Sequence, residues 1–234
     1  AWPVILTMSV ESVVGLVDML MVGRLGTEAV AGVGVATQIH FAVSTVIFAV
    51  GTGTIAVVAR HVGAREPSMA GRVLGQSILA VAVLMTAVAL PVFVWAPTIV
   101  ALFNIEAPVA AIAVDYLRVV LVATPPDAVL VVMGFGLRGA GDTRTPLLVG
   151  VVVAVVNVIG NYLLIFGKFG FPELGPTGAA CGTAIAFATG AVLLFALLVR
   201  GKLVLRLPAG WIRPEAAVIR RVLRGGMPAA DVDL

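Results

Sequence analysis

The chain has 234 residues, of which 61% are hydrophobic and only 12% are charged. Soluble domains average roughly 25% charged residues, about twice the fraction in this chain, and the mean hydropathy here is +1.14. These values exclude a soluble domain with a single membrane anchor and indicate a polytopic membrane protein. The net charge of +3 does not indicate nucleic-acid binding. The basic residues lie between apolar segments, where orientation in the membrane explains them better.

Six segments have the roughly 20 mostly apolar residues that a helical membrane span needs. The predicted fold class is therefore an all-α polytopic membrane protein with six transmembrane helices. In the fourth segment, Pro125-Pro126 is expected to kink the helix, since proline removes an intrahelical hydrogen bond. In chain order the predicted spans are Trp2–Val22, Ala31–Ala59, Val73–Trp95, Val109–Leu137, Pro146–Phe166 and Thr177–Val199.

Composition divides the chain into three parts. Residues 1–199 form the predicted six-helix transmembrane bundle. Residues 200–224 form a basic cytoplasmic linker that ends in Glu215–Arg224, a pattern typical of an amphipathic helix at the membrane surface. A solvated linker explains the same basic stretch equally well. Residues 225–234, which begin Gly225-Gly-Met-Pro228, are interpreted as the truncated start of a seventh helix.

The basic residues divide unequally between the two sides of this topology. One side holds Arg24, Arg118 and Lys168, and the other side holds twelve basic residues. Because Lys and Arg accumulate in cytoplasmic connectors, the richer side and the N-terminus are predicted to be cytoplasmic, in the inner (plasma) membrane of a cell. The twelve are Arg60, Arg65, Arg72, Arg138, Arg144, Arg200, Lys202, Arg206, Arg213, Arg220, Arg221 and Arg224.

Several polar residues lie inside the predicted spans, where a charge costs ~3 kcal/mol or more and usually faces a cavity. Glu11 and Asp18 share one helix face, roughly 10 Å apart along its axis. Asn157 and Asn161 share a face of another helix. A carboxylate with carboxamide oxygens can coordinate a small hard cation or hold a proton. Alternatively, the asparagines are interhelical hydrogen-bond partners, and Glu11 extends to the membrane interface.

Asp127 is the other acid at bilayer depth, beside the double proline. It either lines the same cavity or caps a helix segment that restarts after the kink.

The chain is predicted not to be an enzyme and to need no cofactor. It has no spacing typical of a catalytic triad, a phosphate-binding loop or a metalloprotease. Gly134-Phe-Gly-Leu-Arg-Gly139 matches the dinucleotide-binding pattern, but it closes a membrane helix instead of following a strand. With one cysteine and two histidines there is no cluster of soft-metal ligands.

Several stretches, in their order and spacing, resemble the multidrug and toxic compound extrusion (MATE) transporters of the MOP superfamily. The resemblance spans essentially the whole chain and corresponds to the N-terminal six-helix lobe of a two-lobed family. The stretches are Val17–Gly26, Gly51–Arg60, Tyr116–Arg118, Leu137–Pro146, Asn157–Gly167 and Gly178–Thr183.

The resemblance implies a secondary antiporter that expels cationic, amphipathic compounds in exchange for sodium ions or protons. Some members of the family have Asp where this chain has Asn161, so Asp18 is implied to be the main titratable group, and the choice between sodium and proton stays open. The implied partner is a missing C-terminal lobe or a second copy. By motif, the implied cation site consists of Asp18, Tyr116, Asn157, Asn161 and Thr183.

The chain departs from the family in length, since the family has twelve spans. We expect a fragment, with a truncated gene product and a dimerising half-transporter as the other interpretations. Lipid-linked oligosaccharide flippases share the architecture and are the alternative function, although their cavities tend to be strongly cationic, whereas these spans contain acids. A non-transporting membrane scaffold is the third hypothesis, and it predicts that Asp18→Asn has no effect.

Overall fold

The computed structural model describes residues 2–201, 203–208 and 210–225. These residues form helices joined by short connectors, without a strand in the described ranges. The elements are α1 (Trp2–Gly23), α2 (Thr27–Gly63), α3 (Pro67–Val94), α4 (Ala96–Ala101), α5 (Ala107–Gly139), α6 (Arg144–Phe166), the 3-10 turn η1 (Lys168–Gly170), α7 (Pro176–Val199) and α8 (Ala216–Gly225).

The six predicted spans are confirmed, because α1, α2, α3, α5, α6 and α7 are each long and apolar enough to cross a membrane. The second helix is longer than predicted and runs from Thr27 to Gly63. Hydropathy detects only its apolar part, while the helix continues through polar residues at both ends. The short helix α4 was not predicted. It begins at Ala96 with Pro97 in its first turn, where the missing N–H of proline costs no hydrogen bond.

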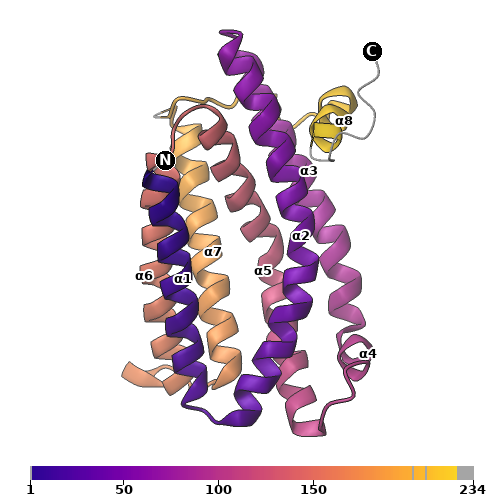
Figure 1. Cartoon of the computed structure of the whole chain (residues 1–234), viewed down its shortest axis with the longest axis vertical. Helices are drawn as coiled ribbons and strands as arrows, with labels where there is room; N and C mark the ends of the chain where they lie inside the picture. Colours follow the sequence, from indigo (N-terminus) through magenta and orange to yellow (C-terminus); the bar gives the residue numbers. More distant parts are fainter. Residues whose placement is uncertain (1, 202, 209, 226–234) are drawn as a thin grey trace.

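The helices form one up-and-down bundle, in which α5 packs against α2, α3 and α7, and α1 packs mainly against α6. Figure 1 shows that the start of α1, the α2–α3 and α5–α6 connectors and α8 lie at one end of the bundle. The α1–α2, α4–α5 and α6–α7 connectors lie at the opposite end. Arg65 belongs to the first end, and Arg24 and Lys168 belong to the second.

Helix α5 runs without interruption through Pro125 and Pro126. Asp127 therefore lies inside a continuous helix, and the capping role considered for it is wrong, since a cap stands just before the first turn of a helix. The glycines near the end of α5 permit close packing. A Cβ on Gly136 would lie 2.6 Å from Leu74 Cδ1 of α3, and one on Gly139 would lie 2.8 Å from the Ile55 carbonyl oxygen of α2.

The stretch after α7 folds back onto the bundle. Helix α8 covers most of the segment predicted to be an amphipathic helix, and it packs against α2 and α3. The predicted seventh helix, residues 225–234, lies outside the described residues except for Gly225, which ends α8.

Candidate functional site

Asp18 of α1 meets Asn161 of α6 inside the bundle. The Asn161 Nδ2 donates a hydrogen bond of 2.7 Å to Asp18 Oδ1. Asn161 is fully buried and Asp18 is partly buried. Since α1 and α6 are adjacent, the carboxylate near the end of the first span is tied to a carboxamide 143 residues later in the chain.

Asn157 and Thr183 complete a polar cluster with these two residues. Asn161 Nδ2 lies 3.3 Å from Asn157 Oδ1, and Asn157 Nδ2 lies 3.1 Å from Thr183 Oγ1 of α7. A half-turn of the Asn157 amide exchanges its nitrogen and oxygen. Nδ2 then donates to Asp18 Oδ1 at 3.0 Å, and Oδ1 accepts from the Thr183 hydroxyl at 3.1 Å. We favour this second orientation, because an ionised carboxylate only accepts hydrogen bonds.

Two glycines place the cluster by bringing α6 and α7 into backbone contact. A Cβ on Gly160 would lie 3.2 Å from Gly182 Cα, and a Cβ on Gly182 would lie 2.7 Å from the Asn161 backbone nitrogen and would overlap Asn161 Oδ1. Gly182 and Gly178 have the spacing of small residues that lets membrane helices approach closely. This spacing is visible in the sequence, but it does not show which helix the two glycines contact.

The cluster offers several oxygen atoms to a small cation. The buried Asn161 Oδ1 has no hydrogen-bond partner, although buried polar atoms are almost always paired. Carboxylate, carboxamide and hydroxyl oxygens from Asp18, the two asparagines and Thr183 are ligands suited to hard cations. The carboxylate of Asp18 is also a place where a proton can bind. The geometry therefore suits either a cation or a proton.

The remaining predicted residues lie outside this hydrogen-bonded cluster. Tyr116 of α5 packs beside it, against the small hydrophobic group that contains Val22 and Ile165. Glu11 is exposed on α1, whereas Asp127 is only 9% exposed within α5. No hydrogen bond joins any of these three side chains to the cluster in the part of the chain that the structure describes.

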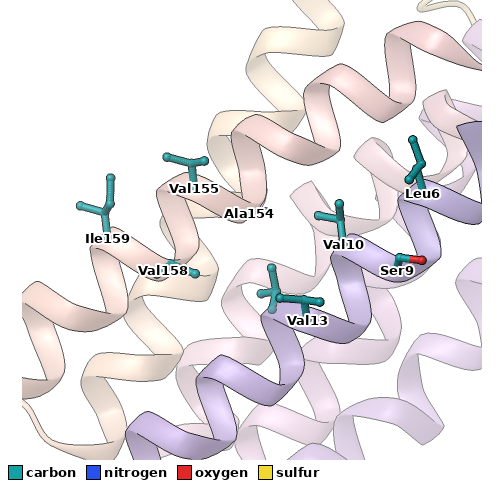
Figure 2. Close-up of a pocket in the computed structure, with 9 residues that line it drawn as sticks. Leu6, Ser9, Val10, Val13, Ala154, Val155, Val158 and Ile159 are labelled. Atoms are coloured by element: carbon teal, nitrogen blue, oxygen red, sulfur yellow. The ribbon is translucent and has the colours of Figure 1, made fainter.

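An apolar groove also lies between α1 and α6, but it is separate from the polar cluster. Figure 2 shows that side chains of both helices line it. It has a volume of about 440 Å³, and Asp18 and Asn161 do not contribute to its lining. Two of the α1 residues that line the groove are exposed, Leu6 at 45% and Val13 at 58%.

Comparison with known families agrees with the resemblance described above. The MatE family model matches residues 3–163. The chain belongs to the MatE family. One relative in this family is the "Probable multidrug resistance protein NorM" of Thermotoga maritima, which is 31% identical over 218 residues, covering 92% of the chain and 46% of the relative. The "Uncharacterized transporter YisQ" of Bacillus subtilis is 27% identical over 234 residues, covering 100% of the chain and 51% of the relative.

Solved structures show the same fold. A multidrug resistance MATE family transporter of the MOP superfamily in its outward-facing conformation superposes with a TM-score of 0.87 at 23% identity, covering 96% of this chain and 49% of that one. A MOP superfamily transporter from Pyrococcus furiosus gives the same TM-score of 0.87 and the same coverage of 96% and 49%. This MatE chain therefore has the fold of half a transporter, and it spans about half the length of the relatives it matches.

Proposed function

We propose that this chain is one lobe of a cation-coupled antiporter that exports cationic, amphipathic compounds in exchange for sodium ions or protons. The observation that carries the proposal is the Asp18–Asn161 hydrogen bond of 2.7 Å, which joins α1 to α6 in an apolar bundle. Membership of the MatE family and similarity to a probable multidrug resistance protein support the class of exported compound. The proposal is tested by measuring ion-coupled export after substitution of Asp18, and we expect export to be lost.

Rotation of one amide group explains how ion binding changes the helix contact. In the structure, Asn161 presents its N–H group to the Asp18 carboxylate, which suits the ion-free form. A bound cation needs oxygen ligands, and a protonated carboxyl needs an acceptor for its O–H group. Both requirements are met when the Asn161 amide turns by half a turn and presents Oδ1 to Asp18. The α1–α6 contact then depends on the ion, as coupling requires.

We further propose that this lobe works with a second lobe or a second copy of itself. Alternating access in such transporters occurs between two repeats that rock around a shared site, and one bundle supplies only one wall. The outer face of α1 fits such a contact, since Ile5, Leu16 and Leu20 are each more than 60% exposed.

The isolated chain should therefore not transport as a monomer. We expect the purified 234-residue chain, reconstituted in vesicles, to show no uptake of a fluorescent organic cation under a sodium or proton gradient. Crosslinking in the same vesicles counts the subunits. Uptake by a crosslinked dimer supports the second-copy form, and uptake by a chain shown to be monomeric contradicts the need for a partner.

We propose that the N-terminus and the α2–α3 connector face the cytoplasm of a cell with this protein in its inner (plasma) membrane. This orientation is supported by the larger number of Arg and Lys residues on that side of the predicted topology, because such residues accumulate in cytoplasmic connectors. In a Cys181→Ala background, Ser68→Cys should be protected from an impermeant thiol reagent added outside, while Asn104→Cys should react. Reaction of both cysteines from the same side would contradict this topology.

A further inference from the structure

Gln76 of α3 makes long-range hydrogen bonds that the proposed transport cycle does not use. Its side chain is fully buried. Nε2 donates to the carbonyl oxygens of Trp211 and Arg213, each at 2.8 Å. Oε1 accepts from the backbone N–H of Glu215 at 2.7 Å. One carboxamide therefore holds three backbone groups of the segment that follows α7, and both of its N–H donors are used.

The surface of α3 around Gln76 is shaped for this segment. A Cβ on Gly71 would overlap the Arg206 carbonyl oxygen, and one on Gly75 would lie 3.0 Å from Trp211 Cβ. Beside them, Arg72 Nε lies 3.2 Å from Glu215 Oε1. Because Gly71 and Gly75 have no side chains, the linker lies close to the backbone of α3 at these two positions, beside Gln76.

The same segment also contacts two other helices. The ring of Trp211 lies 5.8 Å from the ring of Phe195 in α7, centroid to centroid. Helix α8 packs against α2 and α3, with Val222 only 1% exposed. Val222 of α8 is therefore packed on protein, while Leu223 beside it is 39% exposed. We call residues 203–208 and 210–223 the linker strap. It contacts α7, α3 and α2, and Figure 1 shows that its last part, α8, lies at the end of the bundle that holds the α2–α3 connector.

We propose that Gln76 is a positioning residue that clamps the linker strap, so that the adjoining ends of α2, α3 and α7 move as one body. Three backbone groups that would otherwise need water or another partner are satisfied by a single side chain. Loss of that side chain leaves them unpaired next to apolar helices, which favours release of the strap. The role in transport rests on the proposed function, whereas the clamp itself can be measured without transport.

Hydrogen exchange of the purified chain in detergent tests the clamp. We expect the Glu215 amide to be protected in the wild type and its protection to fall about tenfold or more in Gln76→Leu, because the acceptor is gone while the apolar bulk remains. Ser77→Ala is the matched control. Ser77 is as buried as Gln76, but its hydroxyl donates only to the Val73 carbonyl of its own helix, at 2.9 Å. Equal protection of Glu215 in wild type and Gln76→Leu would overturn the clamp.

Distances between spin labels test whether the helix ends move together. In a Cys181→Ala background, labels at Ser68→Cys of α3 and Val199→Cys of α7 should give a narrow distance distribution. Gln76→Leu should broaden it, and Ser77→Ala should not. Trp211→Ala is the second variant, for use if Gln76→Leu does not fold. It removes the ring contact between Trp211 of the linker strap and Phe195 of α7, so it should also broaden the distance distribution. Narrow distributions in both Gln76→Leu and Trp211→Ala would overturn the positioning role. A failure of transport by the wild type in a two-lobe context would count against the proposed function, and it would leave both measurements on the linker strap valid.

Discussion

In a two-lobe context, Asp18→Asn should abolish ion-coupled export while leaving the amount of protein in the membrane near normal. Asparagine has the size of aspartate and can still pair with Asn161, so the α1–α6 contact observed at 2.7 Å can be kept. It carries no charge and binds no proton at neutral pH, so it can neither balance the charge of a bound cation nor exchange a proton for the exported compound. Export of a fluorescent organic cation from cells, normalised to membrane abundance, measures the effect.

Glu11→Gln is the matched control, because it removes a carboxylate from the same helix at an exposed position. We expect this variant to retain most of the export activity. Full export by Asp18→Asn would exclude a coupling role for Asp18 and would agree with the scaffold hypothesis.

Gly182→Ala should disrupt the candidate site and destabilise the bundle. The added methyl group would overlap Asn161 Oδ1 and lie 2.7 Å from the Asn161 backbone nitrogen, so α6 and α7 must separate or Asn161 must move. Overpacking of this kind costs ~1–3 kcal/mol. For a chain of this size that is a fall of roughly 2–12 °C in the midpoint of thermal unfolding. Unfolding of the purified chain in detergent, followed by circular dichroism, measures it.

Gly150→Ala separates this effect from the general effect of replacing glycine in a membrane helix. Apart from its own helical turn, no atom lies within 4 Å of a Cβ built on Gly150 of α6, and alanine is favoured over glycine in helices by ~0.5–1 kcal/mol. We expect its midpoint to be unchanged or slightly higher. An unchanged midpoint in Gly182→Ala would show that the backbone contact between α6 and α7 tolerates a side chain.

The sequence allowed the spans and much of the candidate site to be predicted, because both depend on local patterns. Long apolar runs locate membrane helices, and residues four apart, such as Asn157 and Asn161, must share a helix face. The structure adds that Asp18 and Thr183 lie beside this face. That placement depends on which helices are neighbours, which periodicity does not specify. The family resemblance was needed to link residues from the first, fifth and sixth spans.

Other features depend on contacts that local patterns do not contain. The double proline of α5 was expected to kink the helix, and one alternative placed Asp127 at the cap of a restarted segment, yet α5 is continuous and Asp127 lies within it. Gln76 is a single amide in an apolar span, and its partners are 135 to 139 residues away. A buried glutamine needs hydrogen-bond partners, but the local pattern around Gln76 does not identify the linker as the partner.

Difference infrared spectroscopy of the purified chain tests most directly whether the Asp18 cluster binds the coupling ion. Addition of sodium ions at constant pH, or a change of pH without sodium, should alter a carboxyl band that is absent from Asp18→Asn. A response to sodium alone indicates a cation site, and a response to pH alone indicates a proton site. Identical difference spectra for the wild type and Asp18→Asn under both conditions would contradict the assignment of Asp18 as the ion-binding group.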